Sequence, residues 1–116
     1  MTAGKKMKRF LLIVVLGLNT QIVWASDQAP EGARRTELIR LVREDCGSCH
    51  GLTLEGGLGP PLLPVTMNQK DAAAIREVIL NGLPGTPMPP WARFLTPGEA
   101  QWIATELQKG FPDEVR

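Results

Sequence analysis

The sequence is poor in side chains that bind metals, because its 116 residues include only two cysteines and one histidine. A structural zinc site takes four ligands, so these three side chains cannot build one. No segment alternates apolar and polar residues over the length of a strand, which leaves an all-α fold as the expected class. The chain also lacks the run of about 20 apolar residues that is needed to cross a bilayer.

The N-terminal segment has the pattern of an export signal. Basic residues occur in its first nine positions without any acid, namely Lys5, Lys6, Lys8 and Arg9. An apolar run over residues 10–18 follows, and residues 23–25 resemble a signal cleavage site. We expect residues 1–25 to be a signal peptide, with Ser26 starting a periplasmic protein that has no membrane anchor. A retained anchor is the alternative, and the polar residues 19–21 inside the apolar stretch argue against it.

The mature chain, residues 26–116, is expected to be one small domain with a limited core of its own. Without the four basic residues of the signal it has nine basic and twelve acidic side chains, a net charge of −3. This charge does not indicate a nucleic-acid partner or an anionic membrane surface.

The two cysteines and the histidine occur together as C-x-x-C-H, in Cys46–His50. This is the attachment pattern of a c-type haem. On a helix, residues three apart share a face, so Cys46 and Cys49 could each form a thioether with a haem vinyl group. His50 could then bind the iron as the proximal ligand.

The same cysteines could instead form a disulfide or a C-x-x-C redox pair. A thioredoxin-like pair occurs in a βαβ setting, which this sequence does not indicate. A catalytic Cys–His dyad is a further alternative, but side chains adjacent in the sequence have poor geometry for it. Haem attachment is favoured because the only histidine directly follows the only cysteine pair.

Helical patterns cover three segments, residues 33–49, 71–81 and 97–109. The third has the clearest limits. Thr96 and Glu99 form a capping-box pattern around Pro97, and Gly110 ends the helix. We expect the first and last helices to cross, because short helices at the two ends of a small domain have few other apolar faces to meet.

The segment over residues 51–70 is rich in glycine and proline, and no regular structure is predicted for it. An irregular stretch of about twenty residues is unusual in a compact domain unless it has a function. Its many apolar residues argue against disorder. We expect this segment and residues 83–95 to line a haem cavity.

Met88 lies between Pro87 and Pro89 in the second of these segments. A thioether is a weak ligand for iron, and flanking prolines reduce the entropy that its segment loses on binding. Met88 could also simply fill core space. Met67 is a competing thioether, but it lies near His50 in the chain. We predict Met88 as the second axial ligand.

Together these motifs resemble class I cytochrome c over about residues 33–110. Residues 59–62 match the Gly-Pro-x-Leu element of that family, which implies that the Pro60 carbonyl accepts a hydrogen bond from His50. Three stretches are more narrowly similar to the NirC-type cytochromes, also called cytochrome c-55X, namely residues 45–53, 56–60 and 84–91. That family is found with the nitrite reductase genes of denitrifying bacteria.

The resemblance implies a monohaem electron carrier of the periplasm, and not an enzyme with catalytic residues. Its implied partners are cytochrome cd1 nitrite reductase or factors that mature d1 haem. A gas-binding or sensor cytochrome, from which Met88 dissociates, is the alternative. A peroxidase would need distal acid–base groups, and no distal histidine is available.

Two residues near Met88 are predicted to contact the haem propionates. The indole of Trp91 and the guanidinium of Arg93 can both donate hydrogen bonds to a carboxylate. Alternatively, Trp91 is ordinary core and Arg93 is solvated. The two propionates would bring the net charge to about −5.

Overall fold

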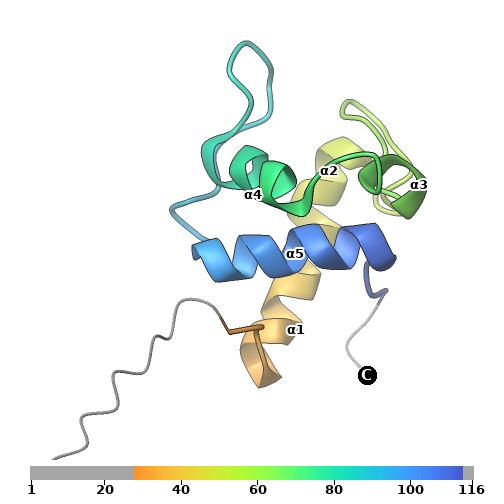
Figure 1. Cartoon of the computed structure of the whole chain (residues 1–116). Helices are drawn as coiled ribbons and strands as arrows, with labels where there is room; N and C mark the ends of the chain where they lie inside the picture. Colours follow the sequence, from red (N-terminus) through yellow and green to blue (C-terminus); the bar gives the residue numbers. More distant parts are fainter. Residues whose placement is uncertain (1–27, 114–116) are drawn as a thin grey trace, which may run out of the picture.

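The computed structural model describes residues 28–113, which form helices and loops with no strand (Figure 1). The predicted signal peptide, residues 1–25, and Ser26 lie outside the described residues. The helices are α1 (Gly32–Leu41), the π-helix η1 (Val42–Cys46), α2 (Gly47–His50), α3 (Pro64–Met67), α4 (Ala72–Asn81) and α5 (Pro97–Lys109). Within this part of the chain, no helix has the length and apolarity needed to cross a membrane. The predicted all-α class is confirmed.

The elements α1, η1 and α2 follow one another without a break, so one helical run extends from Gly32 to His50. This agrees with the helix predicted over residues 33–49. Leu38 and Val42 are four residues apart and fully buried, which gives the run its inner face. The π-helical turn is a difference from the prediction, because apolar periodicity does not distinguish a local π-turn from an α-helix.

The limits of the two later helices are those that their capping residues predict. Gly82 follows the last residue of α4 with a φ of 70°. At the start of α5, Thr96 Oγ1 accepts from the Glu99 N–H at 3.2 Å, and the Thr96 N–H donates to Glu99 Oε2 at 2.9 Å. Gly110, with a φ of 106°, ends the helix. The predicted capping box and the predicted stop at Gly110 are therefore confirmed.

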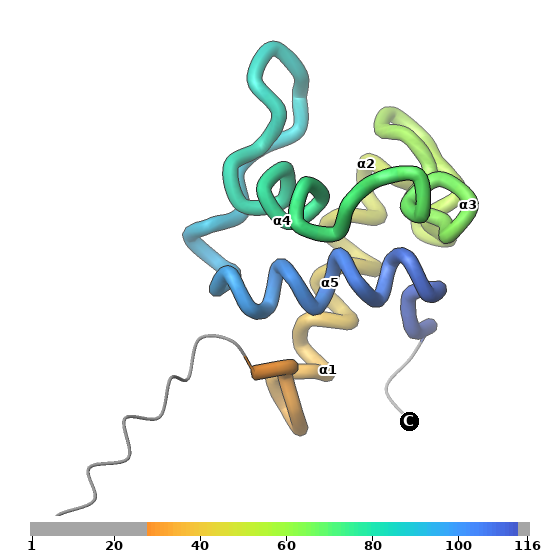
Figure 2. Tube along the Cα trace, viewed as in Figure 1, coloured from red at the N-terminus to blue at the C-terminus, as the bar shows by residue number. Residues whose placement is uncertain are grey.

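Helix α5 crosses α1, as the ribbon and the tube both show (Figures 1 and 2). Arg34 Nε donates to Glu99 Oε1 at 2.6 Å, and the guanidinium of Arg35 lies 5.5 Å from the centre of the Trp102 ring. The buried apolar residues form one cluster: Leu38, Ile39, Val42, Leu54, Met67, Ile75, Leu80, Leu95, Ala100, Ile103, Ala104, Leu107 and Phe111. The expected crossing of the first and last helices is confirmed.

The segment over residues 51–70 contains the short helix α3, which the sequence did not predict. Pro64 suits the first helical position, and the Leu63 carbonyl accepts from the N–H groups of Thr66 and Met67, each at 2.9 Å. The Gln108 side chain donates to the Lys70 carbonyl at 2.8 Å. The same side chain donates to the carbonyl of Met67, the last residue of α3, at 3.4 Å, so α5 contacts a helical turn that is too short to be stable alone.

Candidate functional site

The helical run places Cys46, Cys49 and His50 at its C-terminal end. Cys46 is partly buried against the core, Cys49 is exposed, and both are free thiols. Where η1 meets α2, Ser48 Oγ donates to the Asp45 carbonyl at 2.6 Å. Two thiols one helical turn apart and followed by an imidazole have the spacing that two thioether bonds and a proximal ligand require.

The environment of Cys46 keeps its thiol protonated. Burial, with a further contribution from the neighbouring Asp45 carboxylate, raises the pKa of Cys46 to about 11. The nucleophilic cysteine of a C-x-x-C redox pair has a lowered pKa instead, because the thiolate is the reactive form. Cys46 therefore lacks the character of such a nucleophile.

The imidazole of His50 is held by the chain segment that follows it. His50 Nδ1 lies 2.7 Å from the carbonyl oxygen of Pro60, so the expected hydrogen bond is present. A carbonyl only accepts, so Nδ1 carries the proton and the lone pair of Nε2 is free to bind a metal. A Cβ on Gly59 would lie 2.7 Å from His50 Cε1 and Nδ1. No role of Gly59 is predicted from the sequence, although the Gly-Pro dipeptide marks this turn.

The glycine-rich loop after His50 folds back on the end of the helical run. The N–H of Gly56 donates to the His50 carbonyl at 2.8 Å, and the N–H of Gly59 donates to the Cys49 carbonyl at 2.8 Å. Gly51 begins the loop with a φ of 87°, and a Cβ there would lie 2.6 Å from the Gly56 carbonyl oxygen. The loop thus satisfies helix-end carbonyls and needs glycine for its close approach.

Met88 lies on a second loop that begins after α4. A turn at its start is closed by the Thr86 N–H, which donates to the Leu83 carbonyl at 3.1 Å, and Gly85 within the turn has a φ of 80°. The Leu83 N–H donates to the Met88 carbonyl at 3.2 Å, and the Met88 N–H donates to Thr86 Oγ1 at 3.3 Å. The backbone of Met88 is therefore fixed within its own loop.

The Met88 loop is anchored to the C-terminal end of α4. The Trp91 N–H donates to the Ile79 carbonyl at 3.0 Å, and the Ala92 N–H donates to the Leu80 carbonyl at 3.1 Å. These bonds satisfy carbonyls that the helix end leaves without partners. Residues 82–95 and 51–63 extend from the same end of the molecule, at the top of Figure 1.

Trp91, Arg93 and Met67, the other candidate haem contacts, differ from one another in burial. Trp91 is partly buried, packs against the core, and has its ring centre 5.8 Å from that of Phe94. Arg93 is exposed. Met67 is only 4% exposed and belongs to the core cluster. The contacts of Trp91 and Arg93 with the propionates stay a prediction, whereas Met67 is placed as a core residue.

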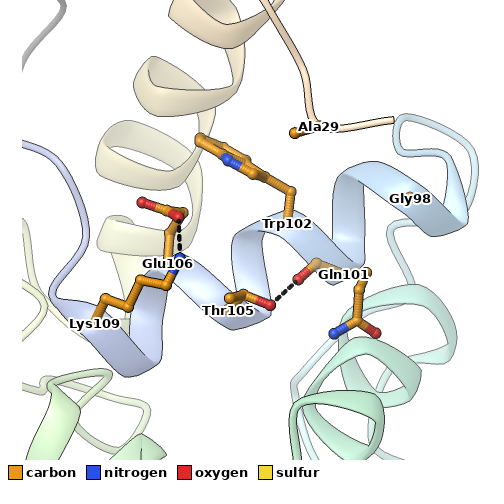
Figure 3. Close-up of a pocket in the computed structure, with 7 residues that line it drawn as sticks. All are labelled: Ala29, Gly98, Gln101, Trp102, Thr105, Glu106 and Lys109. Carbon is orange, nitrogen blue, oxygen red and sulfur yellow. Dashed lines mark hydrogen bonds and ion pairs between the residues drawn. The ribbon is translucent and has the colours of Figure 1, made fainter. Parts of the chain in front are cut away.

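A shallow hollow of about 340 Å³ lies elsewhere, beside α5 (Figure 3). It is lined by Ala29, Gly98, Gln101, Trp102, Thr105, Glu106 and Lys109. Lys109 pairs with Glu106 at 3.3 Å, and the Trp102 side chain projects from α5 (Figure 3). None of the site residues predicted from the sequence lines this hollow.

The C-x-x-C-H end of the molecule fits a covalently held haem. Its donors are two free thiols, an imidazole with one nitrogen free and, on a separate loop, a thioether. Large apolar side chains are also exposed on these two loops: Leu52 is 70% exposed, Leu58 94% and Leu83 47%. Such side chains match the apolar faces of a porphyrin, whose burial would remove them from water.

Known proteins share this sequence and this fold. The family described as cytochrome c oxidase, cbb3-type, subunit III, matches residues 33–105. Cytochrome c55X of Paracoccus denitrificans (strain Pd 1222) is 45% identical over 103 residues, which cover 89% of this chain and 96% of that protein. A solved structure of the c-type cytochrome NirC is similar with a TM-score of 0.68 and 44% identity, covering 70% of this chain and 95% of that one.

A much larger protein contains a similar unit. The structure of dihydro-heme d1 dehydrogenase NirN in complex with DHE is similar with a TM-score of 0.57 and 38% identity, covering 66% of this chain and 16% of that one. The relatives that match over nearly their whole length are instead small cytochromes. The chain therefore belongs to the c-type cytochromes, in the cytochrome c55X or NirC-type family that its motifs resemble.

Proposed function

We propose that this chain carries one haem c on thioether bonds from Cys46 and Cys49, with His50 and Met88 as the axial ligands of the iron. The observation that carries the proposal is the 2.7 Å hydrogen bond between His50 Nδ1 and the Pro60 carbonyl. It fixes the ring and leaves Nε2 free, in the residue directly after the second cysteine. A bond of this kind from the ligand to a carbonyl is typical of metal-binding histidines.

The function that this ligand set supports is the transfer of single electrons. The haem, when bound, supplies an iron that alternates between the ferrous and ferric states. The Pro60 carbonyl holds the His50 imidazole in one orientation. The prolines on both sides of Met88 restrict its loop, so the loop loses little conformational entropy when Met88 binds the iron. His50 and Met88 would hold the iron, and their binding would keep water and small molecules from it. We therefore assign electron transfer and not catalysis.

We place this electron carrier in the periplasm and in nitrite respiration. The export-signal pattern of residues 1–25 supports the location, and the membership in the NirC-type family supports the process. The partners that we propose are cytochrome cd1 nitrite reductase and a factor that matures d1 haem. The similarity to a small part of a dihydro-heme d1 dehydrogenase supports the second partner.

The mass of the exported protein tests the attachment of haem. The full chain is produced in a bacterium that matures c-type cytochromes, and the periplasmic protein is weighed by mass spectrometry. We expect the mass of the chain from Ser26 plus one haem. A mass of the bare chain with a disulfide would refute the attachment, whereas an uncleaved chain with haem would refute only the predicted cleavage.

Stopped-flow mixing tests the partners. The reduced protein is mixed with oxidised cytochrome cd1 nitrite reductase, and the oxidised protein is mixed with dihydro-heme d1 dehydrogenase and its substrate. We expect rapid oxidation in the first mixture, rapid reduction in the second, or both, each faster than with an unrelated c-type cytochrome. No transfer above that control in either mixture would contradict the place in nitrite respiration.

A further inference from the structure

Arg34, in the first turn of α1, connects three parts of the chain. Its Nε donates to Glu99 Oε1 at 2.6 Å, and its Nη2 donates to Glu99 Oε2 at 3.0 Å. The same Nη2 donates to the Phe94 carbonyl at 2.9 Å. Its Nη1 pairs with Glu37 Oε2 at 2.9 Å. One guanidinium therefore joins α1, the first turn of α5 and the end of the Met88 loop, and its two-pronged bond to a carboxylate is of the strong kind.

The carbonyl that Arg34 binds belongs to the part of the Met88 loop that leads into α5. The Phe94 N–H donates to the Trp91 carbonyl at 2.9 Å, and the Trp91 N–H donates to the Ile79 carbonyl at 3.0 Å. The loop is thus held to α4 in its middle and to α1 at its end. Figure 1 shows this segment descending from the loop to the start of α5.

Glu99 is held in place as the partner of Arg34. Its Oε2 also accepts from the Thr96 N–H at 2.9 Å, and its own N–H donates to Thr96 Oγ1 at 3.2 Å. The side chain of Glu99 is 13% exposed. Because the hydrogen bonds from Arg34 lower its pKa, the carboxylate stays charged at neutral pH. The anchor point of the guanidinium is therefore fixed by the start of α5 itself.

We propose that Arg34 is a positioning residue for Met88: it fastens the end of the ligand loop to the crossing of α1 and α5 and so limits the departure of Met88 from the iron. The proposal rests on the proposed function, in which Met88 is an axial ligand. An external ligand can bind only in the fraction of molecules that Met88 has left, so its apparent affinity rises with that fraction. Loss of the charge-assisted bonds of Arg34 increases the fraction.

Imidazole binding to the oxidised holoprotein measures this fraction. Arg34→Gln should bind imidazole about tenfold more tightly than the unsubstituted protein, because it loses the bonds to both Glu99 and Phe94. Arg35→Gln is the matched control, since Arg35 stacks on Trp102 at the same helix crossing and has no bond to the loop. We expect its imidazole affinity to be unchanged. Arg34→Lys keeps the charge without the fork of donors and should give an intermediate affinity.

The outcomes separate the failure of this proposal from the failure of the proposed ligation. The near-infrared sulfur-to-iron band of the unsubstituted protein reports whether Met88 is bound, and its absence would overturn both. If the band is present and Arg34→Gln binds imidazole no more tightly than Arg35→Gln, the positioning role alone is overturned. Should Arg34→Gln not fold, Glu99→Gln takes its place, because it keeps the capping oxygen but weakens the bond to Arg34. An unchanged affinity in that variant would equally overturn the role.

Discussion

Substituting Gly59 with alanine places one methyl group against the ring of His50. A Cβ at position 59 would lie 2.7 Å from His50 Cε1 and Nδ1 and 3.2 Å from Nε2. Nonbonded carbon atoms are most stable at about 3.5–4.0 Å, so the ring must move away by roughly 1 Å. The φ of Gly59 is not positive, and the substitution therefore acts on the ring and not through backbone strain.

This movement should break the bond between the imidazole and Pro60. The Nδ1–O distance of 2.7 Å would lengthen beyond hydrogen-bond range. The bond makes the imidazole more basic, which favours the oxidised iron. If the bond stabilises the oxidised form by about 1 kcal/mol more than the reduced form, its loss raises the potential by about 40 mV for one electron. We therefore expect the potential of Gly59→Ala to rise by about this amount.

A redox titration of the holoprotein measures the shift. Gly32→Ala is the control, because Gly32 has a φ of 53° and nothing lies within 4 Å of its Cβ position. It should cost about 1 kcal/mol of stability without a change in potential. A Gly59→Ala protein that retains its haem and an unchanged potential would refute the tuning of His50 through Pro60.

Three further predictions concern other parts of the molecule. Arg34 lowers the pKa of Glu99, so the stability from this carboxylate is present above its unfolded pKa and is lost as the pH falls through the folded value. The free energy of unfolding in urea should therefore fall between about pH 7 and pH 3. It should fall less over this range for Glu99→Gln, which has no carboxylate to protonate. Met67→Ala should lower the free energy of unfolding by about 2–5 kcal/mol, because a core side chain is removed, and should keep the sulfur-to-iron band. If Arg93 lies beside Trp91 at the propionates, Arg93→Gln should lower the potential, since a positive charge favours the reduced iron; an unchanged potential would place Arg93 in solvent.

The sequence predicted most of the fold because its helix limits depend on local chemistry. The capping box that starts with Thr96 and the glycines at positions 82 and 110 act through bonds and backbone angles of their immediate neighbours. The π-turn over residues 42–46 and the short helix α3 were not predicted. Helix α3 is contacted by a distant part of the chain, through the hydrogen bond from the Gln108 side chain to the Met67 carbonyl, which no local pattern records.

The candidate site was predictable where its residues are close in sequence. The C-x-x-C-H motif follows from spacing alone, and the Pro60 acceptor follows from the family resemblance. The contact of Gly59 with the ring depends on how the loop folds back, and the bonds of Arg34 join residues that are 60 and 65 positions apart. Burial places Met67 in the core, whereas the sequence disfavoured Met67 as a ligand only because it lies near His50 in the chain.

The spectrum and potential of Met88→Ala test the central claim most directly. A neutral thioether favours the reduced iron, so its removal should lower the potential, abolish the near-infrared sulfur-to-iron band and allow the reduced protein to bind carbon monoxide. The haem should stay attached through Cys46 and Cys49, and Met67→Ala should change none of these properties. If Met88→Ala instead keeps the spectrum and the potential of the unsubstituted protein, Met88 is not the ligand and the assignment as an electron carrier loses its main support.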